Sequence, residues 1–447
     1  MMPQCSALVF CLLALFPSHL LAAGGKEAPP SQWTTQAAVH FALEHNPDTR
    51  AALERIHAAD ADIRSAKAAF YPQLGLSTEY SRTNNPMYSF GNILNQGVFS
   101  DRIDFNHPGV TDNLQAKATI QYRLYNGGHD LAALEAADQR GQATQQQQAA
   151  IRSQLGFEVV RAFYTIIQAQ DTVQARKAAL DAISASLTVA QARYQQGSLL
   201  KEELLNLEVQ QARAEEQLIQ AQHGLSLGQR GFLHLLGITE GDVKLDAAAS
   251  QMQEVPVERD IRSRPELVAM SSMIKVQEAA VRQASAGNLP SADAFGSYQV
   301  DKGTELDQGS GNSWTTGVRV NYTLFNGQQT SSATDRAKAQ LAEAREQQRK
   351  MELAFNLEVE QAGLALHQEE ERLKVTGKMV ESAGESARLA RLRFKEGVLL
   401  SSELINTENR LTDARVSHAH ATATRKIAIA DLRRAVGLGQ FNQRTEP

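Results

Sequence analysis

The chain has 447 residues, a formal net charge of −5 at pH 7 and only two cysteines, Cys5 and Cys11. Such a mild negative charge argues against nucleic acid as a partner. Both cysteines lie in an N-terminal stretch that is predicted to be removed. The mature chain is therefore expected to have no disulfide, no cysteine metal site and no cysteine nucleophile.

Residues 1–24 are typical of a secretory signal peptide, because an apolar run from Ala7 to Phe16 precedes small residues at positions 22 to 24. This run is too short to span a bilayer. The bulky Phe10 before Cys11 disfavours lipid attachment at that cysteine. No later stretch has 18 uninterrupted apolar residues, so no transmembrane helix is predicted, although β-strands can still enter an outer membrane.

A helix is predicted up to about Ala69, followed by a proline and a hairpin of two strands. Apolar and polar residues alternate from Leu74 to Tyr80 and from Leu114 to Leu124. This period of two is typical of a strand between lipid and water, and equally of a half-buried strand in an ordinary sheet. The connecting loop, Ser81 to Asn113, is rich in Asn, Gly and Ser.

The next predicted element is a very long helix. From His129 to Tyr194 there is no proline, and a helix of that length extends for about 100 Å at roughly 1.5 Å per residue. Gly197 supplies the left-handed residue that ends the helix and reverses the chain. The returning helix, Leu200 to Leu236, is about half as long as its partner. We expect the segment from Thr34 to Ala69 to stack end to end with it and fill the other half.

The second half of the chain repeats this design. Arg193 to Gly197 reads Arg-Tyr-Gln-Gln-Gly, and Arg393 to Gly397, 200 residues later, reads Arg-Phe-Lys-Glu-Gly. Near the start of each half the offset is 218, since Asn46-Pro47 corresponds to Arg264-Pro265. Self-similarity of this kind predicts two copies of one structural unit.

The duplication divides the chain into expected segments. They are a signal peptide (1–24), an N-terminal extension (25–33), a helical segment (34–69), a β-hairpin with an extracellular loop (70–127), a helical tunnel hairpin (128–236), an equatorial linker (237–261), a second helical segment (262–288), a second β-hairpin (289–327), a second tunnel hairpin (328–437) and a C-terminal tail (438–447).

Four strands per chain cannot close a barrel, and open sheet edges are not tolerated in lipid. The smallest bacterial barrels have about eight strands. Either the strands lie outside the membrane or several chains share one barrel, and a homotrimer would give twelve strands. The predicted fold class is mainly α with a β-barrel part. In it, duplicated halves contribute long coiled-coil-like helices and four β-strands per chain.

The sequence offers no chemistry for an enzyme. Gly224 to Gly228 matches the Gly-x-Ser-x-Gly pattern of hydrolases, but it lies in a helical run with no strand before it. No HExxH, Walker or dinucleotide-binding motif occurs. We therefore expect no catalytic residue, no cofactor and no metal site.

The two helix reversals carry the candidate functional residues. An acidic residue follows each turn glycine by six positions (Glu203, Glu403), and an aromatic residue precedes it by three (Tyr194, Phe394). Helix capping and turn packing explain the glycines, and an acidic residue is favoured in the first turn of a helix. Alternatively, carboxylates at the open end of a helical tube would form rings that select against anions.

Together these features resemble the TolC family of outer-membrane efflux and secretion channels. The resemblance rests on the duplication, on Tyr122 to Gly127 and Tyr322 to Gly327 at the strand ends, on Asn46-Pro47 and Arg264-Pro265 near the start of each half, and on the Arg-Tyr/Phe-x-x-Gly turns. It implies a homotrimer in outer-membrane lipid, with four transmembrane β-strands per chain. A long periplasmic α-helical coiled-coil barrel would hold most of the chain. A periplasmic adaptor protein and an inner-membrane pump would dock at the helical tips. The implied function is a passive exit duct of a tripartite efflux pump or type I secretion system.

Carried over to this sequence, the resemblance places the adaptor-docking tips at Gly197, Ser198, Leu199, Gly397, Val398 and Leu399. It places the periplasmic entrance at Glu203, Glu403, Tyr194 and Phe394. The best-known member of the family closes this entrance with a tyrosine and an arginine around the second tip. Because this chain has Phe394 and Leu399 there, that network cannot form as such.

The alternative interpretation is a trimeric coiled-coil envelope structural protein or adhesin. Such a protein should have one continuous stalk, with strands only at one terminus. Two hairpins embedded between long helices argue against it. A phage or bacteriocin receptor role for the loop Ser81 to Asn113 is compatible with transport.

Overall fold

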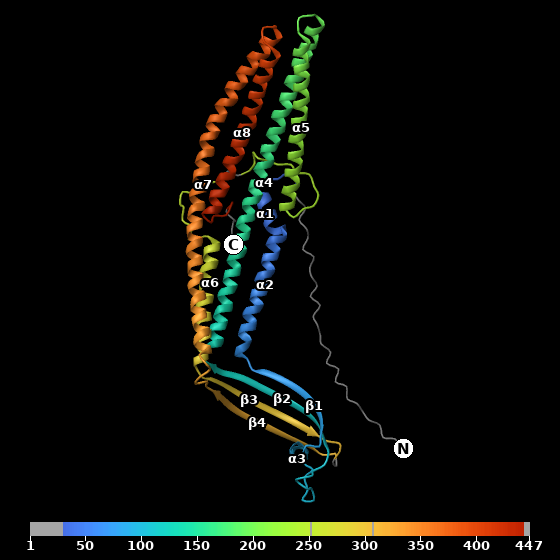
Figure 1. Cartoon of the computed structure of the whole chain (residues 1–447), viewed down its shortest axis with the longest axis vertical. Helices are drawn as coiled ribbons and strands as arrows, with labels where there is room; N and C mark the ends of the chain where they lie inside the picture. Colours follow the sequence, from blue (N-terminus) through green and yellow to red (C-terminus); the bar gives the residue numbers. More distant parts are fainter. Residues whose placement is uncertain (1–29, 251–252, 306–307, 442–447) are drawn as a thin grey trace, which may run out of the picture.

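The computed structural model describes residues 30–250, 253–305 and 308–441. The molecule is elongated, with paired long helices at one end and a sheet at the other (Figure 1). The predicted signal peptide lies outside the described residues. None of the described helices is both long and apolar enough to cross a membrane.

The two halves contain equivalent elements. The first half consists of α1 (Thr35–His45), α2 (Pro47–Lys67), the short turn η1 (Ala68–Phe70), β1 (Gln73–Thr83), α3 (Pro86–Asn95), β2 (Thr111–Asn126), α4 (His129–Gln195) and α5 (Lys201–Leu235). The second half consists of α6 (Pro265–Ser285), η2 (Ala286–Asn288), β3 (Ser291–Lys302), β4 (Ser310–Asn321), α7 (Gln329–Lys395) and α8 (Ser401–Ala435). The long helices α4 and α7 both have 67 residues, and α5 and α8 both have 35, which confirms the duplication.

Short helices stack end to end along each long helix, as expected. α2 and α5 pack on α4, and α6 and α8 pack on α7. α6 and α8 also pack on α4, which joins the two halves. The helical segment expected at 34–69 consists of two helices, α1 and α2, because the chain breaks at Asn46. Asn46 is extended, as a residue before proline tends to be, and its Oδ1 accepts from Asp48 N at 2.7 Å to start α2.

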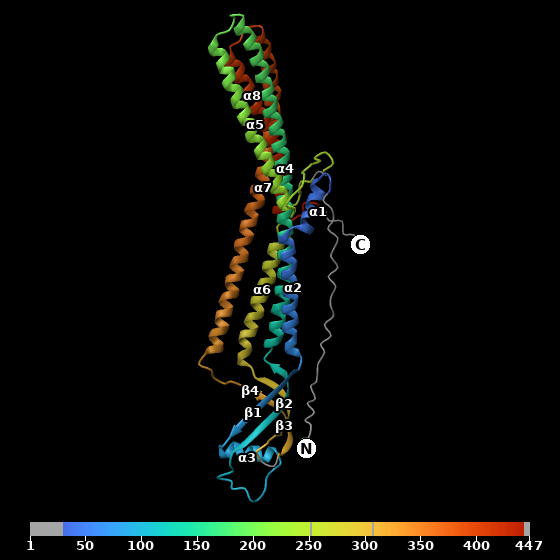
Figure 2. The same cartoon turned by 90° about the vertical axis from the view of Figure 1, so that its right-hand side faces the viewer.

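The largest core cluster lies at mid-height, where α1 meets α4 and α5 (Figure 2). Trp33, Phe163 and Phe232 are fully buried in it. Trp33 also forms an isolated parallel bridge with Leu245, in the linker after α5. Burial of aromatic rings of this size contributes strongly to the stability of a core.

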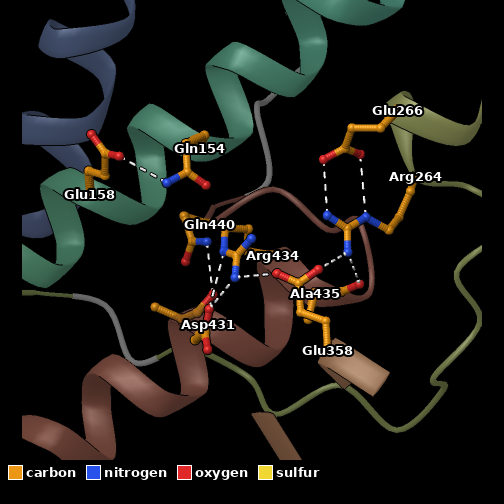
Figure 3. A network of polar contacts seen from close by, with 10 residues as sticks. Gln154, Glu158, Arg264, Glu266, Glu358, Asp431, Arg434, Ala435 and Gln440 are labelled. Atoms are coloured by element: carbon orange, nitrogen blue, oxygen red, sulfur yellow. Dashed lines mark hydrogen bonds and ion pairs between the residues drawn. The ribbon is translucent and has the colours of Figure 1, made fainter. Parts of the chain in front are cut away.

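A buried arginine occupies the junction where α6 and α8 meet end to end (Figure 3). The Arg264 side chain is 2% exposed, and its Nη1 donates to the last backbone carbonyl of α8, Ala435 O, at 3.1 Å. It pairs with Glu266 at 3.0 Å and with Glu358 at 2.5 Å. Its guanidinium lies 3.6 Å from the centre of the Phe355 ring. The charge and the helix end are thus both paired.

In the first half, a smaller side chain pairs with the last carbonyl of the stacked helix α5. Asn46, which corresponds to Arg264, donates its Nδ2 to Leu235 O at 2.9 Å. The last carbonyls of a helix have no partner within it. In each half, therefore, the residue before the proline pairs with the final carbonyl of the stacked helix.

The four strands form one antiparallel sheet in the order β1-β2-β3-β4. Residues directly opposite one another point to the same face. One such row consists of Leu76, Ala118, Tyr298 and Trp314, and the next consists of Ser77, Lys117, Gln299 and Ser313. Leu76 is 83% and Trp314 71% exposed. One face of the sheet is therefore apolar and open, and the other is polar.

The last strand ends early. The second hairpin was expected over residues 289–327, but β4 ends at Asn321, whereas its counterpart β2 reaches Asn126. β2 pairs with β3 past a bulge between Arg123 and Tyr125, while β4 has no neighbour on its far side among the described residues. The edge position of β4 explains the shorter strand.

The loop predicted from Ser81 to Asn113 contains a helix that the pattern did not predict. β1 runs on to Thr83, β2 starts at Thr111, and α3 lies between them. Asn85 caps α3 by accepting from Met87 N at 3.1 Å, with Pro86 next in the chain. This is the same Asn-Pro start as in α2, so the signal was present in the sequence.

Replacing Arg264 with alanine should destabilise the protein by about 3 kcal/mol, because the carbonyl of Ala435 then loses this donor in a buried place and Glu358 keeps only Arg434 as an ion-pair partner. Chemical unfolding of the purified protein measures this loss. Arg262→Ala is the matched control, because the Arg262 side chain is 88% exposed and its ion pair with Asp260 should contribute little. Equal unfolding midpoints for the two variants would contradict the assignment.

The same junction should make stability fall in acid. Burial raises the pKa of Glu358, but hydrogen bonds and charges from Arg264 and Arg434 outweigh it, so this pKa lies below its ordinary value of 4.5. The stabilisation is present above pH 4.5 and is lost as the pH falls through the folded-state pKa. Unfolding midpoints across this range should fall less steeply for Glu358→Gln than for the unaltered chain.

Candidate functional site at the helix reversals

The two helix reversals have the same backbone geometry, at the end of the molecule farthest from the sheet (Figure 1). Gly197 has φ +72° and Gly397 has φ +80°, both in the left-handed region. Ser198 N donates to Arg193 O at 2.9 Å, and Val398 N donates to Arg393 O at 3.0 Å. These bonds close a glycine-terminated helix end, as the sequence predicted.

The aromatic residues that precede the glycines have different surroundings. Phe394 is 2% exposed and packs with Leu207 and Leu404 in a cluster shared by the four helices of the tips. Tyr194 is 41% exposed. The repeat therefore places equivalent residues in a buried position in one half and on the surface in the other.

Arg193 connects the two tips. Its Nη1 donates to Phe394 O at 3.1 Å, and its Nη2 donates to Ser198 O at 3.3 Å. Its guanidinium lies 5.7 Å from the centre of the Phe394 ring. Sequence reasoning used this arginine only as part of the turn motif, because its partner lies in the other half of the chain.

Glu203 also reaches across to the other half. Its Oε2 accepts from Ser401 N, at the first residue of α8, at 2.7 Å. Leu400 precedes α8 and offers no side-chain cap, so Glu203 caps the helix in its place. A carboxylate is favourable there, because the backbone N–H groups at a helix start are unpaired and carry partial positive charge. Glu203 thus stabilises the start of α8 rather than the start of its own helix, α5.

Glu403, the counterpart of Glu203, is exposed on α8. Within the described part of the chain, its carboxylate has no hydrogen-bond or ion-pair partner. Leu200, which precedes α5, likewise provides no side-chain cap. The single chain therefore has one capping contact of this kind, from Glu203 to α8. Among the described residues, neither the Glu403 carboxylate nor the start of α5 has the equivalent contact.

The predicted docking tips present apolar side chains to solvent. Val398 is 75% exposed, while Leu199 and Leu399 are half-buried against the tip cluster. The Ser198 hydroxyl donates to Arg193 O at 3.0 Å. Leu200 and Leu400 are also exposed, at 71% and 62%. Sequence reasoning passed over these two leucines, although they follow the turn glycines at equal distances.

The described residues contain no cluster of three or more His, Cys, Asp or Glu side chains that could hold a metal ion. The tips therefore consist of backbone turns, an apolar cluster, one cross-connecting arginine and acidic residues.

Alanine at the two turn glycines should have unequal effects. Both positions have positive φ, so each substitution costs on the order of 1 kcal/mol in backbone strain. A Cβ at Gly397 would also lie 2.9 Å from Arg193 Nη2, whereas at Gly197 nothing lies within 4 Å. Gly397→Ala should displace Arg193 and speed amide hydrogen exchange at both tips. Gly197→Ala is the control, and equal exchange in the two variants would contradict the bridging role of Arg193.

Comparison with known proteins places the chain in a family. The family model described as outer membrane efflux protein matches residues 38–235 and 258–438, which is one match in each half. The chain is 26% identical over 302 residues to protein CyaE of Bordetella pertussis, a match that covers 65% of this chain and 60% of CyaE. It is 25% identical over 427 residues to outer membrane protein OprJ of Pseudomonas aeruginosa, covering 90% of this chain and 83% of OprJ.

A solved structure of a membrane protein from Pseudomonas aeruginosa has the same fold, with a TM-score of 0.80 at 20% identity and coverage of 92% of both chains. The aligned region spans about three fifths of the length of CyaE. Since the family model matches most of both halves, the chain belongs to the outer membrane efflux protein family.

Proposed function

We propose that this chain is the outer-membrane exit duct of a tripartite efflux pump or type I secretion system. Three copies form one channel, with the sheets in the outer membrane and the long helices in the periplasm. The observation that carries the proposal is the combination of a four-stranded sheet with one apolar face and two 67-residue helices continuing from it. Each helix extends for about 100 Å, which suits a passage across the periplasm.

The sheet supports assembly from several copies. Its apolar rows suit contact with lipid, and its polar rows suit contact with water. The outer edges of β1 and β4 have no partner among the described residues, and unpaired strand edges are not tolerated in lipid. Twelve strands from three copies would pair every edge and close the sheet.

The tips support docking of a partner. Each copy presents two reversals with exposed apolar residues, Leu200 in the first and Val398 and Leu400 in the second. A periplasmic adaptor bound here would connect the duct to an inner-membrane pump. The pump supplies the energy, because the duct itself has no nucleotide-binding motif and conducts passively. The relative OprJ is named as an outer membrane protein, which supports this location.

The channel prediction can be tested directly in planar bilayers. The purified protein should form channels that favour cations, because Glu203 and Glu403 bring six carboxylates to the entrance of a trimer. Native mass measurement should give three chains. A monomer, or an absence of conductance from a folded protein, would contradict the proposed function.

Neutral substitution at the entrance should reduce block by multivalent cations. In the double variant Glu203→Gln and Glu403→Gln the six negative charges are removed, while each side chain can still accept a hydrogen bond. The cation concentration that halves the conductance should rise by roughly tenfold or more, since like-charged carboxylates in proximity favour a bound cation. Glu381→Gln, exposed on α7 away from the tip, is the control and should leave block unchanged.

A further inference from the structure

We infer that α3 lies inside the outer mouth of the channel, where the three copies of α3 meet through an apolar face and narrow the exit. This inference rests on the proposed trimer and concerns the end of the sheet farthest from the long helices (Figure 1). The second half has no counterpart of α3 among the described residues, because only the short segment 303–309 joins β3 to β4. The helix is therefore an addition to the repeated design.

The contacts of α3 show which face of the sheet it covers. Gln96, directly after α3, donates its Nε2 to Asn113 Oδ1 on β2 at 3.1 Å. A Cβ at Gly311 on β4 would collide with Asn95 O, the last residue of α3. Positions 113 and 311 are each separated by an even number of residues from the polar row of their strand, so both belong to the polar face. The helix therefore packs on the polar face.

The apolar face is open at the same end of the sheet. Tyr80 lies opposite Leu114, and Val300 follows on β3, with all three side chains exposed. In a membrane barrel with a water-filled interior, the apolar face contacts lipid and the polar face lines the lumen. In the proposed trimer, α3 therefore lies on the lumen side of the barrel wall.

The helix is held in place by buried contacts. The side chains of Ser89 and Ile93 are fully buried, and Gln96 is nearly so. Ser89 Oγ donates to Gly109 O at 2.8 Å, and Gln96 Nε2 donates to Asp112 O at 2.7 Å. Buried polar groups that lose such partners are costly, so these bonds favour one position of α3 on the sheet.

An aromatic cluster adds support beside the helix. The Phe90 ring on α3 lies 4.6 Å from the Phe105 ring and 5.9 Å from the Phe99 ring, measured between ring centres. Aromatic pairs at such distances are favourable. The segment after α3 thus folds back onto the helix and supports it.

The side of α3 that points away from the sheet is apolar. Met87 is 82% and Leu94 52% exposed, and a Cβ at Gly91 would have nothing within 4 Å. These three residues are spaced by four and three positions, so they lie on one face of the helix. At 100° per residue, this face is on the opposite side from Ser89 and Ile93. It is therefore directed from the wall into the lumen.

The other two copies of α3 are the partner that fits this face. Lipid does not reach it, because the sheet lies between α3 and the membrane. A threefold arrangement turns the face of each copy toward the same axis, so Met87 and Leu94 of the three copies can pack together away from water. Gly91, between them, lets the helices approach closely.

The size of the barrel agrees with this arrangement. Twelve strands about 4.8 Å apart and tilted by about 40° form a barrel about 24 Å across, measured between backbones. A helix with its side chains is about 10–12 Å wide, so three helices in mutual contact fill a circle about 22 Å or more across. The α3 helices, rather than the strands, then set the width of the exit, and a folded polypeptide cannot pass between them.

Cross-linking of a single introduced thiol tests whether the three helices meet. Both natural cysteines lie in the predicted signal peptide, so Met87→Cys would carry the one thiol of the mature chain. In the purified full-length protein, a short thiol cross-linker should convert this variant into covalent dimers, and a three-armed reagent into trimers. Tyr80→Cys is the matched control. Its side chain is also exposed near this end of the sheet, but it lies on the apolar face, where the copies are separated by the barrel.

The outcomes separate this inference from the proposed function. A trimer in native mass measurement in which Met87→Cys and Tyr80→Cys cross-link equally, or not at all, would overturn the meeting of the helices and leave the duct intact. A protein that remains a monomer would overturn both.

Access of thiol reagents tests whether α3 narrows the exit. Ser77, exposed on the polar face farther from the outer end, would carry the thiol in intact cells that hold the full chain in their outer membrane. A small maleimide should label Ser77→Cys readily, whereas a maleimide on a large polymer should not. Adding Met87→Asp and Leu94→Asp should raise the rate of polymer labelling by roughly tenfold or more, because six carboxylates facing one axis repel one another.

The control for access is Asn84→Cys, in the exposed loop before α3, which both reagents should label. If the polymer labels Ser77→Cys as fast as Asn84→Cys in the otherwise unaltered chain, the mouth is open and α3 does not narrow it. If the two aspartates leave polymer labelling of Ser77→Cys unchanged, the width is set by another part of the barrel and the inference is wrong.

Discussion

The structure depends on how two short helices meet end to end beside a longer one. Each junction buries a helix C-terminus, whose last carbonyls have no partner within the helix. Arg264 solves this in the second half with a buried guanidinium that pairs with Ala435 O and two carboxylates, and Asn46 solves it in the first half with one amide. Without these bonds, the final carbonyls of α5 and α8 would be buried without a partner where α2 and α6 meet them. The length of the helical part of the molecule therefore depends on a few polar atoms at mid-height.

Local signals in the sequence predicted the long helices and their reversals to within a residue or two. They succeeded because helical periodicity and a left-handed glycine are properties of adjacent residues. The contact of Glu203 could not be predicted this way, since its partner Ser401 lies 198 residues away in the chain. The early end of β4 also could not, because strand length depends on a neighbouring edge. The break at Asn46 and the helix α3 could have been predicted from the sequence, because an Asn-Pro pair starts both α2 and α3.

The duplicated halves have diverged in a consistent direction. Residues at the internal boundary, such as Phe394 and Ser401, are buried, whereas their counterparts Tyr194 and Lys201 are exposed. The same fold position is therefore occupied by an apolar or small residue where the chain itself covers it, and by a polar one where it does not. The chain therefore has the fold of the outer membrane efflux protein family, although Phe394 and Leu399 differ from the residues that the resemblance led us to expect at the tips. The fold is retained, while Arg193 and Glu203 connect the tips by bonds of their own.

The junction at Arg264 also determines when the chain can fold. Its acceptor, Ala435 O, lies 171 residues further along, and α8 packs on α4 from the first half. Trp33, close to the start of the described chain, meets Leu245 beyond α5. Contacts of such long sequence separation make folding slow, because the chain must close large loops before they form. A chain entering the periplasm from its N-terminus thus cannot complete either junction early, and it exposes apolar helix faces until its last helix has arrived.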